Sequence, residues 1–239
     1  MTAAQPIDVA ALLVSLVGTA SYLAFHYGLE QRVRPAATPS DNAAVMRAVE
    51  RQRYGGALLL GVLPGVALLV WLRAAGLAWP DHLWGWGLPY PARSALATLG
   101  LLALTLPAVL ISARKPDFRN HYPQARLAGE AAWTPALQRR NRLSWGVYLL
   151  GYEAFFRGWL LFVLVDAVGL WLALGWMTTL YVAVHLTKNA QEAAACLPMG
   201  FVFGGVALWT GSFWAPMLAH ACIAITAETL ATRPSPQRA

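Results

Sequence analysis

The chain has 239 residues, of which 58% are hydrophobic and only 12% are charged, with a net charge of +7. An average soluble domain carries about 25% charged residues. The composition therefore excludes an ordinary soluble globule, a disordered chain and a disulfide-rich secreted module. Because half the usual charge cannot cover a surface that faces water, we expect an integral membrane protein.

Seven apolar segments are long enough to cross a bilayer, which takes ~20 mostly apolar residues. Their approximate bounds are 7–28, 54–76, 94–113, 144–167, 169–187, 193–210 and 213–232. The sequence thus predicts an all-α, polytopic membrane helix bundle of about seven transmembrane helices, organised as one membrane domain over residues 1–239. Within it, residues 1–143 are expected to supply N-terminal helices and cytoplasmic loops.

Basic residues concentrate in two of the connections. One lies between the first and second spans and includes Arg32, Arg34, Arg47, Arg51 and Arg53; the other is the connection 114–143, which carries seven Lys and Arg residues. By the positive-inside rule, both connections and the C-terminus are cytoplasmic and the N-terminus lies outside. We expect the loop 77–93 to form an outer aromatic belt and the loop 114–143 to lie on cytoplasmic headgroups, with a short surface helix.

Ionisable residues inside membrane spans are costly and mark function or a structural pairing. Glu153 and Arg157 are four residues apart and so share one helix face, either as a structural ion pair or as part of a site. His185, Lys188 and Glu192 form one stripe if their helix continues that far, and His220 and Glu228 form another. We expect the two His and three Glu to share one polar site.

A polar site of this composition could catalyse peptide hydrolysis without a Ser or Cys nucleophile. A Glu and a His that meet around one water form a general-base pair, and a second donor can stabilise the oxyanion. Zinc bound by His185, His220 and a Glu is an alternative. No HExxH motif is present to support it. We therefore expect no cofactor, and zinc stays possible but unsupported. No phosphate-binding loop is present, which disfavours a nucleotide-driven pump.

Three motifs in the C-terminal part resemble those of the CAAX protease and bacteriocin-processing (CPBP, or Abi) membrane family. Gly151–Gly158 reads GYEAFFRG, similar to the EExxxR motif that often ends in FRG. Tyr181–His185 is similar to FxxxH, and Trp214–His220 ends in the His of HxxxN. The order and spacing fit, and the resemblance predicts a catalytic core over residues 144–232.

The resemblance implies an intramembrane endopeptidase and assigns roles residue by residue. His185 would orient the attacking water, His220 would donate to the oxyanion, and Glu153 and Arg157 match the second Glu and the Arg of the first motif. Two positions depart from the family pattern: Tyr152 replaces the first Glu, and Ala224 replaces the Asn. A Tyr hydroxyl, with an ordinary pKa of about 10, is a poor base near neutral pH.

The base is therefore expected to be Glu153 or Glu192. One branch of the family has a similar combination of segments. In this chain the segments are Tyr152 to Gly158, then His185, Lys188 and Glu192, then Thr210-Gly211-Ser212. This combination favours a variant active site over decay of the motif.

We expect a peptidase, glutamic-type or metal-assisted, that cuts a membrane-associated protein or peptide. The alternatives are a catalytically inactive membrane scaffold or immunity protein and, less favoured, a proton-coupled carrier. The expected partners are the protein or peptide substrate and the lipid bilayer, with no nucleic acid. The expected location is the inner membrane of a bacterium.

Overall fold

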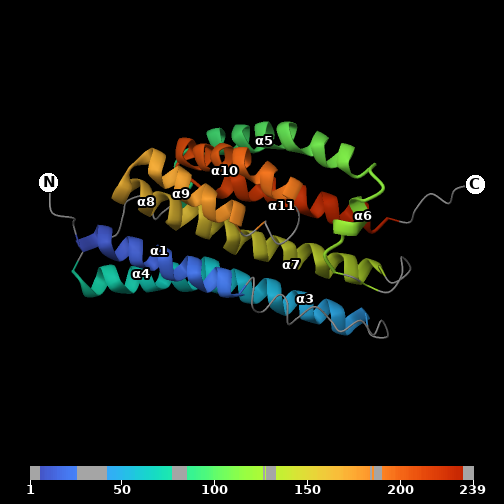
Figure 1. Cartoon of the computed structure of the whole chain (residues 1–239), viewed down its shortest axis with the longest axis horizontal. Helices are drawn as coiled ribbons and strands as arrows, with labels where there is room; N and C mark the ends of the chain where they lie inside the picture. Colours follow the sequence, from blue (N-terminus) through green and yellow to red (C-terminus); the bar gives the residue numbers. More distant parts are fainter. Residues whose placement is uncertain are drawn as a thin grey trace, which may run out of the picture.

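The chain is described from a computed structural model that covers residues 6–25, 42–76, 85–125, 127, 133–183, 185 and 190–233. Every regular element in these ranges is helical, which confirms the predicted all-α bundle (Figure 1). In chain order the elements are α1 (Pro6–Ala24), α3 (Asn42–Ala57), η2 (Leu58–Val62), α4 (Leu63–Ala74), α5 (Pro91–Ser112), α6 (Phe118–His121), α7 (Pro135–Glu153), η5 (Ala154–Leu160), α8 (Leu161–Val168), α9 (Leu170–Ala183), α10 (Ala190–Thr210) and α11 (Trp214–Ala231).

Two long composite helices organise the bundle, α3–η2–α4 and α7–η5–α8, each interrupted by a π-helical segment. They touch backbone to backbone at two glycines. A Cβ added to Gly61 of η2 would lie 2.6 Å from the Cα of Gly151, and one added to Gly151 of α7 would lie 2.6 Å from the Cα of Ala57. Only glycine permits this approach, which brings η2 beside the end of α7.

Both composite helices begin earlier than the sequence predicted. The helix that contains the second span begins at Asn42 rather than near residue 54, and α7 begins at Pro135, inside the segment 114–143 that we predicted as a loop. The loop prediction is wrong for 135–143 because Thr134 caps the helix, accepting from Leu137 N at 3.3 Å, and Pro135 fits the first turn.

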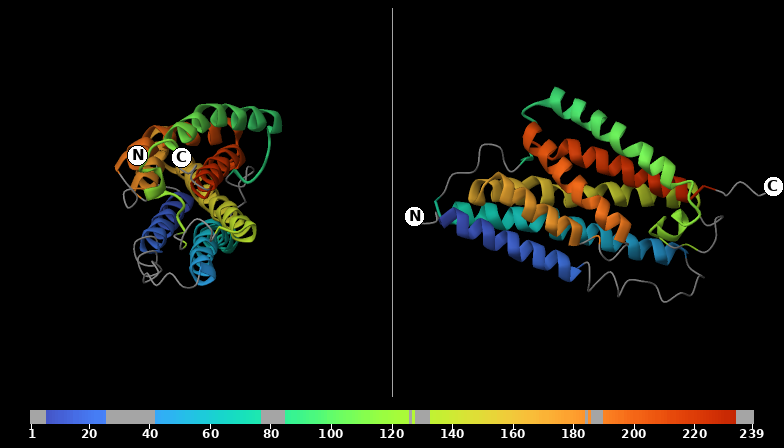
Figure 2. Two further views of the ribbon diagram at one scale, coloured as in Figure 1. Left: turned by 90° about the vertical axis from the view of Figure 1, so that its right-hand side faces the viewer. Right: turned by 45° about the horizontal axis from the view of Figure 1, so that its top comes forward.

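Four described helical stretches are long and apolar enough to cross a membrane: Asn42–Ala74, Pro91–Ser112, Pro135–Val168 and Ala193–Thr210. The shorter apolar helix α9 and the helices α1 and α11 occupy the other three predicted segments. α5 lies at the outer edge of the bundle in Figure 2. Only 17% of its apolar 18-residue stretch is buried inside the protein. Its exposed Leu96, Leu99 and Leu104 suit contact with lipid, as expected for an integral membrane protein.

The centre of the bundle is formed around η5. Phe155, Phe156 and Trp159 are fully buried, and Tyr22 of α1 lies against Phe155 and Phe156. Met177 of α9 is fully buried in the same cluster. The segment that carries the first motif is therefore surrounded by other helices, which keeps lipid and bulk water away from it.

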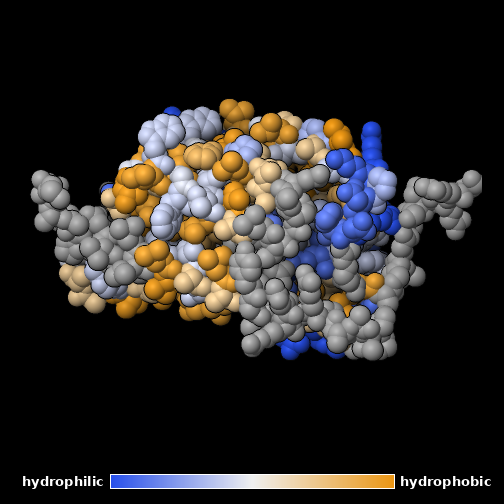
Figure 3. All heavy atoms as spheres, viewed as in Figure 1, coloured by the Kyte–Doolittle hydropathy of each residue, from blue (hydrophilic) through white to orange (hydrophobic). Residues whose placement is uncertain are grey.

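The charged segments meet at one end of the molecule. α6 packs against the end of α11 through Phe118, Ala227 and Ala231, and α3 is joined to α7 by Arg140 and Glu50. Figure 3 shows the hydrophilic side chains gathered toward this end, on the right of the view. The arrangement suits a cytoplasmic end, and the orientation in the membrane stays a prediction.

Candidate active site

The site is built on the junction of α7 and η5. Glu153 ends α7 and Arg157 lies one turn later in η5, and both side chains are 0% exposed. Arg157 Nη1 donates to Glu153 Oε1 at 2.9 Å, so the ion pair predicted from their spacing is confirmed. π-Helical turns inside α-helices are often found at functional sites.

α11 brings a histidine to the same carboxylate. His220 Nδ1 lies 2.6 Å from Glu153 Oε1, which therefore accepts from both His220 and Arg157. Since an ionised carboxylate only accepts, the Nδ1 atom carries the proton, and in the neutral ring Nε2 has the lone pair. The His220 side chain is 18% exposed, so it is the member of this group that reaches the surface.

Aromatic rings enclose the arginine. The guanidinium of Arg157 lies 4.0 Å from the centroid of the Tyr181 ring, 5.5 Å from that of Phe203 and 5.8 Å from that of Phe156. A cation over an aromatic face is stabilised by the ring quadrupole, more strongly where water is excluded. These rings, from η5, α9 and α10, fix Arg157 and hence the carboxylate that it holds.

His185 lies next to this group through Tyr181. Its Nδ1 atom donates to the Tyr181 carbonyl oxygen at 2.8 Å, and the two ring centroids are 4.8 Å apart. A carbonyl only accepts, so Nδ1 carries the proton here as well. Tyr152 lies between the two histidine neighbourhoods, with its ring 5.8 Å from His220 and 6.0 Å from Tyr181.

Four buried polar atoms in this group have no hydrogen-bond partner among the described residues: Glu153 Oε2, Tyr152 Oη, and the Nε and Nη2 atoms of Arg157. Buried polar atoms in proteins are almost always satisfied by protein or by ordered water. Glu153 Oε2 and the two Arg157 nitrogens therefore have unused capacity to hold a water or a polar group of a substrate.

The predicted stripe of His185, Lys188 and Glu192 is only partly covered by the described residues. α9 ends at Ala183, His185 lies in a turn, and α10 begins at Ala190. Glu192 lies in α10, but its side chain, like Lys188, lies outside the described residues. The turn at His185 does not continue α9, so the condition on which the stripe depended is not met at that residue, and the places of Lys188 and of the Glu192 side chain stay a prediction.

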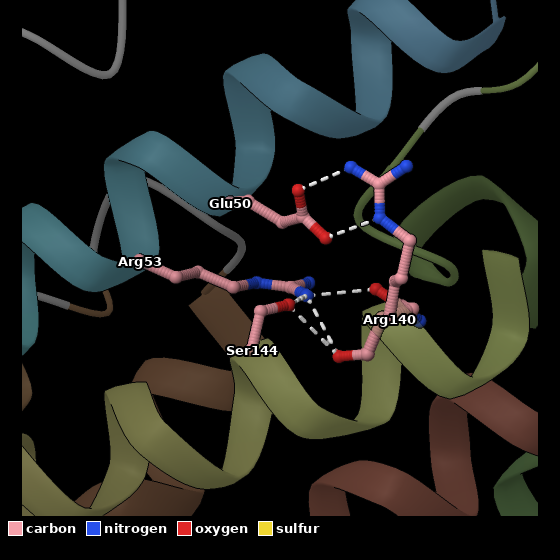
Figure 4. A network of polar contacts seen from close by, with 5 residues as sticks. Glu50, Arg53, Arg140 and Ser144 are labelled. Carbon is pink, nitrogen blue, oxygen red and sulfur yellow. Dashed lines mark hydrogen bonds and ion pairs between the residues drawn. The ribbon is translucent and has the colours of Figure 1, made fainter.

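Glu228 lies outside the site, which corrects the expectation of one polar site shared by the two His and three Glu. It lies in a second buried network at the charged end, where its Oε2 accepts from Asn141 and its Oε1 from the backbone N of Gln124. Asn141 in turn accepts from Arg53 of α3, which we predicted to lie in a loop. Figure 4 shows Arg53 directed at Ser144 of α7.

No motif or spacing in the sequence predicts this second network. Asn141, Ser144 and Gln124 are neutral, and their distance from Glu228 along the chain hid the contact. In the described part of the chain, no group of three or more His, Cys, Asp or Glu side chains is placed to hold a metal ion.

The fold and this buried Glu–Arg–His group define an integral membrane helix bundle with a polar site in its interior. Residues 143–226 match the family model described as type II CAAX prenyl endopeptidase Rce1-like, and this match confirms the resemblance to the CPBP family over that region. The matched region runs from α7 into α11 and contains Glu153, Arg157, His185 and His220. No curated protein and no solved structure matched the chain. Membrane protease is the general class of function that the family match supports.

Proposed function

We propose that this protein is an intramembrane endopeptidase that hydrolyses a peptide bond of a membrane-associated protein or peptide. The observation that carries the proposal is the contact of His220 Nδ1 with Glu153 Oε1, inside the region that matches the endopeptidase family. A carboxylate that accepts from Nδ1 orients an imidazole and stabilises its protonated form, while Nε2 is left to take a proton from water.

In the proposed reaction, His220 Nε2 removes a proton from the attacking water as the water oxygen bonds to the peptide carbonyl carbon. The protonated His220 hydrogen-bonds from Nε2 to the oxyanion and then transfers that proton to the leaving nitrogen, as the C–N bond breaks and the oxyanion collapses to the carboxyl group of the product. Glu153 accepts from Nδ1 of the imidazolium, and the hydrogen bond from Arg157 holds that carboxylate in place. His185 is the second imidazole near the site, and we assign it the orientation of the water.

This assignment moves the base from the carboxylates to His220. Glu153 is fully buried and one of its oxygens already accepts two hydrogen bonds, whereas His220 is partly exposed. Glu192, the other carboxylate in the motif pattern, remains a candidate, and the experiment below separates the two.

The substrate class that we propose is broad. The family model is named for type II CAAX prenyl endopeptidases. A prenylated tail, a leader peptide and a C-terminal sorting segment would all present an extended peptide at the membrane. We place the enzyme in the inner membrane of a bacterium, with the charged end of the bundle in the cytoplasm.

The test is a comparison of native membranes that contain the wild type, Glu153→Gln, Glu192→Gln, His185→Ala or His220→Gln, adjusted to equal abundance. The N- and C-terminal peptides of membrane proteins are quantified by mass spectrometry. We expect a defined cleavage product that vanishes with His220→Gln and Glu153→Gln and persists with Glu192→Gln. Loss of the product with Glu192→Gln alone would assign the base to Glu192.

A second candidate function is a scaffold that binds a membrane partner and cuts nothing. It is favoured by Tyr152, whose buried hydroxyl replaces a carboxylate of the family motif, and by Ala224, which has no side-chain hydrogen-bonding group. Identical peptide patterns in all five membranes would establish this second function and overturn the first.

A further inference from the structure

In the described part of the chain, α7 and α11 are joined by two polar contacts, one buried and one partly buried. One is the Glu153–His220 contact of the site, and the other is the bond from Asn141 Nδ2 to Glu228 Oε2, at 2.8 Å. The contacts are separated by roughly 18 Å along α7 and roughly 12 Å along α11, given a rise of about 1.5 Å per residue. The second contact therefore lies outside the site but on the same pair of helices.

The second contact is fixed on both sides. Arg53 Nη1 donates to Asn141 Oδ1 at 2.7 Å, which leaves the Asn141 amide nitrogen directed at Glu228. The other oxygen of Glu228 accepts from Gln124 N at 2.9 Å. Arg53 also donates to Ser144 Oγ and lies 4.3 Å from the centroid of the Trp145 ring. Arg53, Asn141 and Glu228 are all buried.

Apolar contacts alone define the position of α11 poorly. The residues that α11 buries include four alanines, namely Ala215, Ala219, Ala227 and Ala231. Small side chains let helices approach closely, but they form a smooth face with few interlocking positions. A buried polar contact, in contrast, is satisfied in one register only, and a displaced register leaves a carboxylate without its donors.

We propose that Glu228 and Asn141 are positioning residues that set the register of α11 on α7 and so bring His220 to Glu153. The inference rests on the proposed function for its consequence in catalysis, but the contact that it predicts can be measured without a substrate. A one-residue shift of α11 would move His220 by ~1.5 Å along the axis and ~100° around it, which would break the 2.6 Å contact.

The test reads the His220–Glu153 contact directly by NMR. Full-length protein is labelled with ¹⁵N-histidine in detergent micelles, and the Nδ1 proton shared with the carboxylate is observed as a downfield resonance, assigned by its loss in His220→Gln. We expect Glu228→Gln and Asn141→Asp each to abolish this resonance. In Glu228→Gln, two amide donors face each other, and one is left without an acceptor. In Asn141→Asp, two carboxylates face each other without a donor between them.

The double variant Asn141→Asp with Glu228→Gln exchanges the carboxylate and the amide, so every hydrogen bond of the contact is kept. We expect it to restore the resonance. The control is Glu50→Gln, which removes a carboxylate from the Arg140 contact between α3 and α7 at the same end of the molecule and leaves α11 untouched. The control is expected to retain the resonance.

Persistence of the resonance in a folded Glu228→Gln protein would overturn the proposal. So would a double variant that folds without the resonance, or one that fails to fold while the Glu50→Gln protein folds. If the single variants do not fold, the double variant decides alone. A wild-type protein that shows the resonance but cleaves nothing would contradict the proposed function and leave this inference standing.

Discussion

His220 Nδ1 and Arg157 Nη1 donate to the same oxygen of Glu153, at 2.6 Å and 2.9 Å, although His220 lies on α11 and the other two residues lie at the junction of α7 and η5. One carboxylate oxygen thereby links two helices and a buried cation. The Glu153 side chain has no exposed surface, so its charge is balanced by protein groups and not by bulk water. This arrangement leads to the following predictions.

His220→Gln should abolish cleavage while the protein remains folded. The Gln amide can still donate to Glu153, but it cannot take a proton from water, so we expect a loss of about 10²–10⁴-fold in cleavage rate. The measurement is the rate of product formation in membranes with matched protein levels. The control is His121→Gln in α6, at the charged end, which should cleave at the wild-type rate. Cleavage by His220→Gln at more than a tenth of the wild-type rate would remove His220 from the mechanism.

Arg157→Leu should destabilise the fold as well as stop cleavage. It leaves the Glu153 carboxylate buried with His220 as its remaining partner, and loss of one member of a buried pair costs about 3–5 kcal/mol. We expect Glu153→Gln combined with Arg157→Leu to recover part of that stability, because neither charge is then left unpaired. Thermal unfolding in detergent measures both. A double variant no more stable than Arg157→Leu would contradict this account of the pair.

Tyr152→Phe should cleave like the wild type and unfold at nearly the same temperature. The Tyr152 hydroxyl has no hydrogen-bond partner among the described residues, while its ring makes the contacts with His220 and Tyr181 that Phe would keep. Cleavage rate and thermal unfolding are measured side by side. A tenfold loss of rate without loss of stability would show that the hydroxyl takes part in the reaction.

Gly151→Ala should destabilise the bundle. Overpacking typically lowers the free energy of unfolding by about 1–3 kcal/mol, and we expect a loss of at least this size. Its Cβ would lie 2.6 Å from both the Cα and the carbonyl oxygen of Ala57, so the two composite helices would have to separate beside Glu153. The matched control is Gly146→Ala on the same helix, where an added Cβ meets nothing within 4 Å. Equal unfolding temperatures for the two variants would show that the close approach is dispensable.

The charged end of the bundle should face the cytoplasm. Single cysteines are introduced at Arg139 and at Arg93, both exposed, in a chain without Cys196 and Cys222. A membrane-impermeant maleimide should label the cysteine at 93 in intact cells and the cysteine at 139 only after the cells are opened. The reverse pattern would invert the predicted topology.

The sequence by itself determined the class of fold and one contact of the candidate site. Hydrophobic length alone predicts membrane helices, because a bilayer imposes that length on every span. The spacing of Glu153 and Arg157 predicts their contact because residues four apart share a helix face. The ordered motifs predicted the resemblance to the family, which the family model matches over residues 143–226.

Only the tertiary structure decided which polar residues meet across helices. It assigned His220 to Glu153 and Glu228 to Asn141, although both His220 and Glu228 belong to one stripe of α11. The spacing of residues along a helix shows which face each residue occupies. It does not show which residue of the neighbouring helix lies opposite. That partner depends on the register between α7 and α11, and the register is set by contacts between residues far apart in the chain, which no local pattern encodes.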